Sequence, residues 1–422
     1  MSKILYYTLS VCPECLKEIP AQVVEDNQEV YMKKYCPEHG WGKTLIWQDT
    51  AADYLSWLED GGVGIDKLPQ TEKEVCQKMA AGEFSECAQM QPCTGALMTT
   101  NRCNMNCPVC FTRKNGDDIY EPDLKKCEEL LDFYKDSAGD NALLELCGGE
   151  PTVREDLPQI AELARKKGFD YIQLNTNGIR LGQSVSYCTK LRESGVTTAY
   201  LGFDGLNENA YLKKYGKNLL DIKKQAVENC AKADMAVVLV TCVIPGGNDE
   251  QLGEIIAFAK SHMPTVKGVY LQPISYFGIY PKENCVRITI PEVIRRLNEQ
   301  TKGEVQSRDF LPGAYEHAAC TFQAIYMRSK DGTLRSLNRR QKRNQTDEGY
   351  KSIRKSTKQL WLPSNDQIIS IGGMAFQDAG NIDLLRMRRC SVQIIGKDKQ
   401  MIPLCTKYLS DMQGNKLFPG IA

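Results

Sequence analysis

The sequence predicts an α/β protein, in which a partial (β/α)6 barrel follows a small N-terminal metal-binding domain and precedes a cysteine-containing C-terminal extension. Between residue 96 and about residue 305, strand-like and helix-like segments alternate, as they do in parallel βαβ units. Short cysteine motifs precede this region, and the alternation is lost after it. A chain of 422 residues is long for a single domain. We therefore expect four regions, at residues 1–50, 51–95, 96–305 and 306–422.

The alternating region can be divided into its elements. The expected strands are residues 96–100, 143–146, 171–175, 198–203, 237–243 and 268–272. The expected helices are residues 122–137, 157–167, 183–194, 219–233 and 250–262, followed by a sixth that begins at Pro291, because proline suits the first turn of a helix. In parallel α/β folds the functional groups gather at the carboxyl ends of the strands, so we expect the site there.

Composition restricts the classes of function. There are 53 Lys and Arg residues against 53 Asp and Glu residues, so the net charge does not suggest a nucleic-acid partner. No apolar run is long enough to span a membrane, and the first residues do not resemble a signal peptide, so we expect a cytoplasmic location. In a reducing compartment, 18 cysteines indicate metal binding and not disulfides.

The N-terminal region contains two short metal-binding motifs, Cys12-Pro-Glu-Cys15 and Cys36-Pro-Glu-His39. The segment between them predicts a β-hairpin. Three cysteines and one histidine form the closed tetrahedral ligand set that structural zinc prefers. We expect zinc in this zinc-ribbon-like domain, and a rubredoxin-like iron is the alternative. A segment with so small a core should depend on its metal to fold.

The connecting region at residues 51–95 holds Cys76, Cys87 and Cys93. The spacing of these cysteines fits two interpretations equally well. They are either ligands of an auxiliary cluster or ordinary buried cysteines.

The most informative motif is Cys103-x3-Cys107-x2-Cys110, which follows the first expected strand. Soft thiolates select iron–sulfur clusters or zinc. A 4Fe–4S cluster needs a ligand on each of its four irons, so three cysteines leave one iron open for a small molecule. A zinc knuckle, or a cysteine-rich loop without metal, is the alternative.

Polar or glycine-rich turns follow later strands of the expected barrel. They contribute Gly148, Gly149 and Glu150 after the second strand, Asn175, Thr176 and Asn177 at the third, Asp204 at the fourth and Gln272 at the sixth. Glycine lets the backbone approach a ligand closely, and Glu150 can accept a hydrogen bond. Each turn alone is weak evidence for a binding site, but their shared position at the strand ends strengthens the prediction of one common site.

These motifs resemble the radical S-adenosylmethionine (SAM) superfamily. The C-x3-C-x2-C spacing followed by Phe111 is typical of that superfamily, and Gly148 to Pro151 is similar to its GGEP motif. The resemblance implies a partial radical SAM barrel in which SAM chelates the open iron and Glu150 binds its ammonium group. It also implies one-electron cleavage of SAM to methionine and a 5′-deoxyadenosyl radical, with a flavodoxin- or ferredoxin-type electron donor.

The wider layout resembles one branch of this superfamily. In that branch, CPxC and CPxHG motifs precede TNRCNxxCPxCF, GGEPTxREDLP, NTNGxR, FDG and a late PxC segment, all of which occur here. The branch includes archaeal enzymes that methylate a pterin with a folate-type methylene donor, the tetraether lipid synthase and TrsS-type (seleno)proteins. Some members carry auxiliary clusters. In this chain the widely spaced Cys76, Cys87 and Cys93 replace a compact cysteine run, which leaves the ligands of such a cluster open.

The resemblance predicts a transferase that acts on an unactivated carbon of a small-molecule or lipid substrate. The reaction is expected to be methylation or the formation of a C–C bond at that carbon. The alternatives are a maturase that modifies peptides and an electron carrier that no longer cleaves SAM. Cys320, Cys390 and Cys405 are further candidate ligands of an auxiliary cluster. The segment that contains Cys390 and Cys405 is expected to cap the active site, and the alternative is that residues 371–422 only complete the fold. We expect Asn177 and Asp204 to line the substrate space, with Gln272 on its far side.

Overall fold

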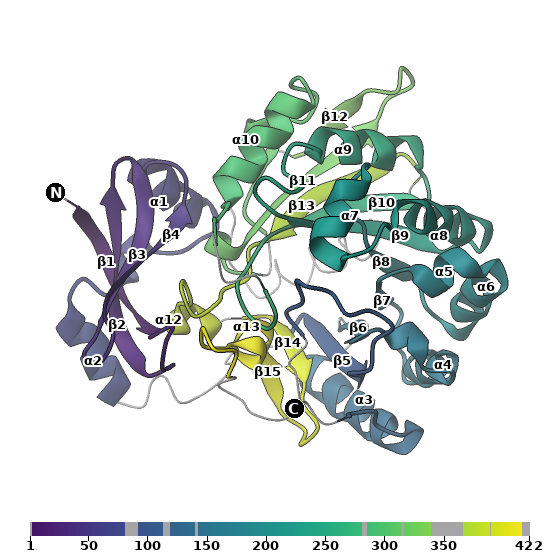
Figure 1. Cartoon of the computed structure of the whole chain (residues 1–422), viewed down its shortest axis with the longest axis horizontal. Helices are drawn as coiled ribbons and strands as arrows, with labels where there is room; N and C mark the ends of the chain where they lie inside the picture. Colours follow the sequence, from purple (N-terminus) through teal and green to yellow (C-terminus); the bar gives the residue numbers. More distant parts are fainter. Residues whose placement is uncertain are drawn as a thin grey trace.

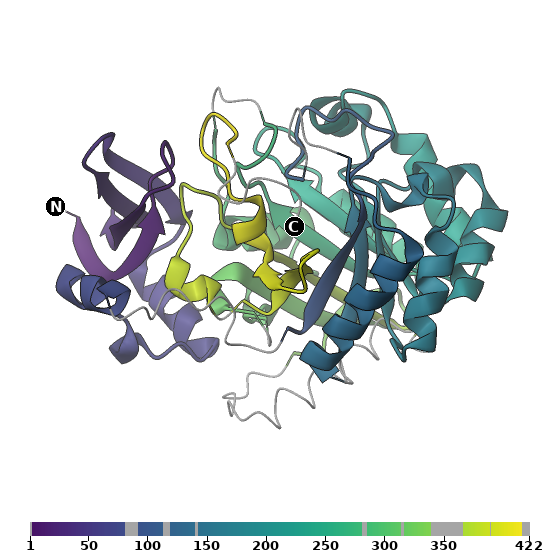
Figure 2. The same cartoon turned by 90° about the horizontal axis from the view of Figure 1, so that it is seen from below.

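The computed structural model describes residues 2–80, 92–112, 119–139, 142–280, 285–313, 316–338, 366–388 and 390–415. A small N-terminal sheet lies beside a larger α/β body, and the C-terminal segments lie between them (Figures 1 and 2). Cys87 lies outside the described residues.

The N-terminal domain is a four-stranded antiparallel sheet in the order β1-β2-β3-β4. Its strands are β1 (Lys3–Val11), β2 (Glu18–Asp26), β3 (Glu29–Cys36) and β4 (Gly40–Trp47). The middle pair, β2 and β3, forms the hairpin that the sequence predicts. Two helices follow this sheet, α1 (Ala51–Asp60) and α2 (Glu72–Ala80). Trp47, Tyr54 and Leu58 bury their side chains where α1 packs on the sheet.

The six predicted barrel strands form in the predicted order, each parallel to the next. They are β5 (Thr94–Thr100), β6 (Leu143–Gly148), β7 (Ile172–Thr176), β8 (Thr198–Gly202), β9 (Ala236–Val243) and β10 (Val266–Pro273). Their side chains alternate, so that Leu144 and Leu146 of β6 lie in the core under the helices while Glu145 and Cys147 face the barrel interior.

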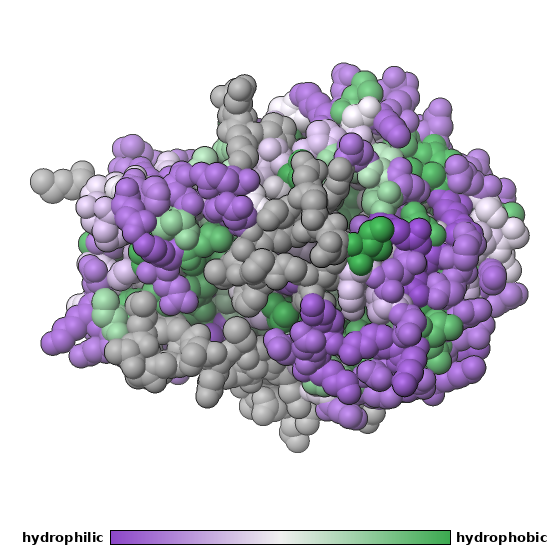
Figure 3. All heavy atoms as spheres, turned by 60° about the horizontal axis from the view of Figure 1, so that its bottom comes forward, coloured by the Kyte–Doolittle hydropathy of each residue, from purple (hydrophilic) through white to green (hydrophobic). Residues whose placement is uncertain are grey.

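Helices surround the outside of these strands as an arc (Figure 1). They are α3 (Leu124–Ala138), α4 (Leu157–Lys166), α5 (Ile179–Gln183), α6 (Val185–Ser194), α7 (Glu208–Tyr215), α8 (Leu220–Lys232), α9 (Leu252–Ser261) and α10 (Ile290–Gln300). The sequence did not predict α5 and α7. On the face seen in Figure 3, hydrophilic residues cover most of the described surface on the side of the α/β body, as expected where helices pack their apolar sides inward.

The C-terminal extension contributes more to the barrel than the sequence predicts. Two of its strands, β13 (Ile368–Met374) and β14 (Val392–Ile395), pair in parallel with β10 and β5, at opposite edges of the six-stranded sheet. The antiparallel strands β11 (Thr321–Arg328), β12 (Leu334–Ser336) and β15 (Met401–Pro403) extend the edges, and two short helices, α12 (Leu384–Met387) and α13 (Leu404–Tyr408), complete the extension. Over the described residues, the result is an eleven-stranded sheet with the order β12-β11-β13-β10-β9-β8-β7-β6-β5-β14-β15.

Side-chain contacts join the extension to the N-terminal domain. Thr8 Oγ1 donates to Asp383 Oδ1 at 2.6 Å, and Ser10 Oγ donates to the carbonyl oxygen of Ile382 at 2.6 Å. The buried Lys34 donates to the carbonyl oxygen of Ala379 at 2.6 Å. The metal-binding domain therefore packs against the segment that borders one edge of the barrel.

Candidate active site

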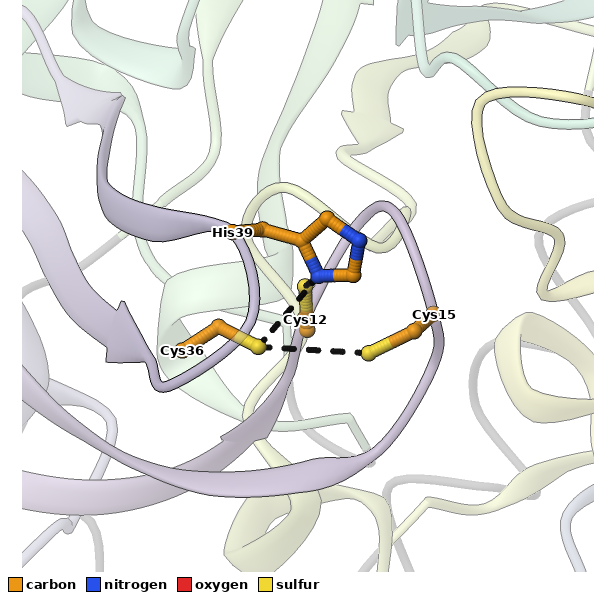
Figure 4. A group of neighbouring side chains, drawn as sticks. All are labelled: Cys12, Cys15, Cys36 and His39. Atoms are coloured by element: carbon orange, nitrogen blue, oxygen red, sulfur yellow. Dashed lines mark hydrogen bonds between the residues drawn. The ribbon is translucent and has the colours of Figure 1, made fainter.

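The side chains of the two N-terminal motifs converge on one place (Figure 4). The ligand atoms of Cys12, Cys15, Cys36 and His39 all lie within 4.8 Å of one another. His39 Nδ1 lies 3.5 Å from Cys12 Sγ and 3.4 Å from Cys36 Sγ, and the Sγ atoms of Cys15 and Cys36 are 3.9 Å apart. These separations fit four ligands around one zinc ion, whose bonds to sulfur and nitrogen are about 2.0–2.3 Å long. The hydrogen bond to His39 lowers the pKa of Cys36 to about 6, which favours the thiolate that a metal needs.

A cavity of about 250 Å³ lies at the carboxyl ends of the barrel strands. We call it the outer cavity. Its wall contains eleven of the twelve site residues predicted for the barrel: Cys103, Cys107, Cys110, Phe111, Gly148, Gly149, Glu150, Asn175, Thr176, Asn177 and Gln272. The turns at the strand ends, each of which is weak evidence for a site when taken alone, therefore meet at one cavity.

The three core cysteines, Cys103, Cys107 and Cys110, line this cavity from the loop after β5. Burial raises the pKa values of Cys103 and Cys107 to about 11. These groups are therefore neutral thiols at pH 7 unless a metal replaces their protons, and an iron cluster does so. Three thiols in the wall of one cavity suit the three cysteine ligands that a 4Fe–4S cluster with one open iron needs.

The cysteine loop is held by later parts of the chain. Cys110 and Ile279 exchange two backbone hydrogen bonds of 2.8 Å. The ring of Phe111 packs against Phe277, Phe376 and Tyr408, with the ring centroids 5.1 to 6.3 Å apart. Phe111 thus lines the cavity and also fastens the loop to the C-terminal extension.

Gly148 and Gly149 are required by the neighbouring cysteine loop. A Cβ atom on Gly148 would lie 1.9 Å from the carbonyl oxygen of Thr100, and one on Gly149 would lie 2.4 Å from that of Arg102. The amide of Gly149 donates to Thr100 at 2.8 Å, and the amide of Glu150 donates to Arg102 at 2.9 Å. Among the described residues, the closest approach of both glycines is to the backbone that carries the cysteines, and both also line the outer cavity, where we expected them to admit a ligand.

Glu150 is 1% exposed and holds a network of four hydrogen bonds. Its Oε1 accepts from the amide and hydroxyl of Thr152 and from the hydroxyl of Thr176, at 3.1, 2.6 and 2.7 Å. Its Oε2 accepts from the amide of Asn177 at 2.6 Å. Oε1 accepts three of these hydrogen bonds and Oε2 only one, so Oε2 is the oxygen that can accept a further hydrogen bond from a ligand in the cavity. This geometry fits the ammonium group of SAM.

Asp204 is the barrel residue that the structure places elsewhere. It is fully buried and is not part of the cavity walls described here. Its Oδ1 accepts from Lys214 Nζ and from the amide of Cys242, both at 2.8 Å, and its Oδ2 accepts from the Tyr215 hydroxyl at 2.5 Å. The prediction that Asp204 lines the substrate space is not what the structure shows, because its side chain turns toward α7 and β9. It positions Lys214 and Tyr215, which do line the outer cavity.

Lys214 is the cation that the sequence analysis missed. Burial alone would lower its pKa, but the charge of Asp204 outweighs this effect and raises the pKa. A protonated ammonium therefore faces the cavity at neutral pH. Lys214 lies on α7, an element that the sequence pattern did not predict, so no local signal indicated it.

A second cavity, of about 320 Å³, lies inside the barrel and shares wall residues with the outer cavity. We call it the inner cavity. Glu145 and Gln272 line both cavities. The sequence analysis also missed Glu145, although a glutamate in the middle of the apolar strand Leu143–Gly148 is unusual and could have indicated a site.

The candidate auxiliary cysteines are only partly brought together. Cys320, Cys390 and Cys405 line one small enclosed space, and we call them the auxiliary thiol cluster. Cys93 lies next to this space, because its amide donates to the carbonyl oxygen of Ser391 at 2.9 Å. Cys76 is exposed on α2 and does not line this space.

A buried positive charge lies beside the auxiliary thiol cluster. Arg386 Nη2 donates to Cys320 Sγ at 2.8 Å. Burial raises the pKa of Cys405 to about 12 and that of Cys390 well above its usual value. Without a metal these two thiols would be neutral, and a negatively charged metal cluster would balance the charge of Arg386.

Comparison with known proteins agrees with this geometry. The model of the radical SAM superfamily matches residues 97–259, and that of the HMPTM N-terminal zinc ribbon domain matches residues 4–48. These matches confirm the predicted radical SAM core and zinc ribbon, together with the cofactors that the two domains use: a 4Fe–4S cluster, SAM and zinc.

The similar proteins include enzymes with different reactions. The 7,8-dihydro-6-hydroxymethylpterin dimethyltransferase of Methanocaldococcus jannaschii is 39% identical over 312 residues, which are 72% of this chain and 60% of that protein. A probable GTP 3′,8-cyclase of Methanococcus aeolicus is 25% identical over 242 residues, which are 56% of this chain and 77% of that protein. The structure of Streptococcus suis SuiB bound to its precursor peptide SuiA has a TM-score of 0.41 at 13% identity, with 73% of this chain and 71% of that chain covered.

The helices of the described residues include none that is both long and apolar enough to cross a membrane.

Proposed function

We propose that this chain, which belongs to the radical SAM superfamily and carries an HMPTM-type zinc ribbon, methylates an unactivated carbon of a small, pterin-like heterocycle in the joined cavities. The observation that carries this proposal is the pair of adjoining cavities that extends from the core cysteines into the barrel. The 39% identical relative is named as a pterin dimethyltransferase, and this chain spans 60% of its length.

The size and polarity of the cavities favour a small molecule. Their volumes of about 250 and 320 Å³ suit one bicyclic ring system beside a cofactor. Polar side chains, among them Glu145, Gln173 and Asn175, lie in the inner wall, where a lipid chain would leave the remaining acceptor positions of Glu145 without donors. The interior position of the inner cavity also suits a small molecule better than a peptide.

The residues of the outer cavity divide the work of binding. When bound, the cluster and SAM together supply the radical chemistry that acts on an unactivated carbon. Glu150 offers its remaining acceptor to the SAM ammonium, and Lys214 offers a positive charge to a carboxylate. Asn177 Nδ2 donates to Asn104 Oδ1 at 2.7 Å and so joins the turn after β7 to the cysteine loop. Tyr408, Phe376 and Leu404 of the extension cover the cavity and keep water away from the reacting atoms.

We further propose that the auxiliary thiol cluster, with Cys93 as the fourth ligand, holds a second iron–sulfur cluster. The convergence of three thiols on one space and the charge of Arg386 support this assignment. Such a cluster, next to the inner cavity, would relay electrons or anchor the substrate. Electrons would reach the enzyme from a flavodoxin- or ferredoxin-type donor.

The test is a reaction in the absence of oxygen with reconstituted enzyme, dithionite and SAM. Reactions with 6-hydroxymethylpterin should yield 5′-deoxyadenosine and a methylated pterin, detected by mass spectrometry. Parallel reactions with a labelled SAM methyl group and with a labelled folate-type methylene donor identify the source of the carbon. The variant Cys107→Ala should yield neither product.

Other outcomes would replace the proposal. Modification of peptide substrates in place of pterins would favour a maturase. Absence of 5′-deoxyadenosine from an enzyme with a full core cluster would favour an electron carrier, although the intact Glu150 network would then have no purpose.

A further inference from the structure

Glu145 is a buried carboxylate that the proposed SAM site does not use. It lies in the middle of β6, is 9% exposed and lines both cavities. A buried carboxylate is normally paired with a cation, yet Glu145 has no ion pair among the described residues. Its position between the core cysteines and the barrel interior is where a substrate must lie.

Two amides hold this carboxylate and leave part of it unused. Asn175 Nδ2 donates to Oε1, and Gln173 Nε2 donates to Oε2 at 3.1 Å. Because each oxygen has about two acceptor positions, one remains on each. The two remaining positions form a paired acceptor, which suits a ligand with two neighbouring N–H donors.

The wall beside this acceptor is aromatic. Tyr200 is the strand neighbour of Asn175 in the β7–β8 register, and its ring lies 5.7 Å from that of Tyr270 between centroids. Both tyrosines line the inner cavity. Flat rings next to a paired acceptor fit a planar heterocycle whose polar edge points at the carboxylate.

We propose that Glu145 determines substrate specificity by accepting two hydrogen bonds from adjacent donors of the heterocycle, a ring N–H and an exocyclic amino group. A 2-amino-4-oxo-pyrimidine ring, as in pterins, has this pair of donors. A lumazine, which has an oxygen in place of the amino group, presents one donor and one acceptor. This proposal rests on the proposed function and names the group that recognises its substrate.

The test compares two ligands and several proteins. Equilibrium dialysis of the cluster- and SAM-loaded protein, with the fluorescence of the free ligand as readout, gives the Kd of 6-hydroxymethylpterin and of 6-hydroxymethyl-lumazine. Wild type should prefer the pterin. Glu145→Gln should bind the pterin roughly tenfold to a hundredfold more weakly, the loss expected for a charge-assisted hydrogen bond. It should reverse the preference, because a carboxamide offers the acceptor and the donor that match a lumazine.

A matched control and a test on the ligand keep the outcome clear. Glu316 lines the same inner cavity, and Glu316→Gln should keep the wild-type preference for the pterin. Wild type should also reject a 3-methyl pterin, which lacks the ring N–H, and this measurement does not depend on the folding of a variant. The amount of 5′-deoxyadenosine that each variant forms reports whether the SAM site is intact.

Each outcome has a distinct meaning. Suppose that wild type binds pterins but Glu145→Gln keeps the wild-type preference for the pterin, or that Glu316→Gln reverses this preference. In either case the role of Glu145 is refuted, while the proposed function stands. If wild type binds the 3-methyl pterin as well as the parent compound, the role of Glu145 is also refuted. If wild type binds neither pterin nor lumazine, the proposed function fails, and the inference fails with it.

Discussion

Replacement of Asp204 by asparagine should destabilise the protein, because it removes the negative charge from a buried ion pair. The carboxylate is fully buried and accepts from Lys214 Nζ at 2.8 Å, from the amide of Cys242 at 2.8 Å and from the Tyr215 hydroxyl at 2.5 Å. Loss of one partner of a fully buried pair costs about 3–5 kcal/mol, and the cost here should lie near the lower limit, because the Lys214 side chain is 16% exposed. We expect Asp204→Asn to lower the free energy of unfolding by about this amount.

The pH dependence of this pair follows from the sign of the lysine shift. Burial alone would lower the pKa of Lys214, but the Asp204 charge raises it above its unfolded value. A raised lysine pKa contributes stability that is fully present below the unfolded pKa and is lost as the pH rises through the folded pKa. At neutral pH the contribution is therefore complete, and it should decline only in alkaline solution.

The assay is urea denaturation of the metal-loaded protein without oxygen, in a double-mutant cycle of Asp204→Asn and Lys214→Met. The double variant should be more stable than the sum of the single losses predicts, because it no longer buries an unpaired ammonium. Asp309→Asn is the matched control, since Asp309 accepts a hydrogen bond of 3.0 Å from the Tyr326 hydroxyl and has no ion pair among the described residues. That control should cost about 1 kcal/mol. A loss below about 1 kcal/mol for Asp204→Asn, or strict additivity with Lys214→Met, would refute the reasoning.

Four further predictions concern the metals, the titration of the site and the extension. Cys12→Ala should lower the zinc content by about one ion per chain in elemental analysis, and an unchanged content would contradict the tetrahedral assignment. Replacement of the three core cysteines should leave a protein that still binds iron and sulfide. Further replacement of the auxiliary thiol cluster should remove this iron and sulfide. A protein without iron after replacement of the core cysteines alone would exclude the second cluster. Burial raises the pKa of Glu145 to about 7. Pterin affinity in equilibrium dialysis should therefore fall as the pH drops below about 7, because protons compete for the carboxylate. An affinity that is constant from pH 5 to 8 would contradict this role. Truncation after residue 370 should abolish stable folding and cluster binding, measured by circular dichroism and iron content, because it removes part of β13 and all of β14; a truncated protein that keeps its core cluster would show that residues 371–422 act only as a cap.

The pH prediction for Glu145 depends on the groups that face it. The neighbouring Cys147, Tyr171, Tyr200, Tyr270 and Tyr408 all have raised pKa values, so they stay neutral near pH 7. Lys214 and Glu316 lie on the same cavity wall. Lys214 stays protonated in this range. The variant Glu316→Gln is the control for the second carboxyl group on the wall of the inner cavity.

The sequence by itself determined the features that depend on local spacing. The structure brings the predicted Cys103-x3-Cys107-x2-Cys110 loop and Glu150 to one cavity, and it brings the predicted ligand atoms from Cys12 to His39 close together. Spacings of a few residues restrict where ligand atoms can lie almost independently of the rest of the fold. The six barrel strands were also predictable, because parallel βαβ units leave a regular alternation of apolar segments.

The tertiary structure alone decided the features that depend on pairing between distant segments. The insertion of β13 and β14 at opposite edges of the barrel depends on contacts between residues far apart in the chain. Asp204 follows β8, close to the predicted end of the strand, but its buried carboxylate forms an ion pair with Lys214 of α7, which lies on a distant element that the sequence pattern did not predict. The alternation of side chains along β6 points Glu145 inward. Glu145 is a candidate for recognition of the substrate because of its neighbours in three dimensions and not because of its neighbours in sequence.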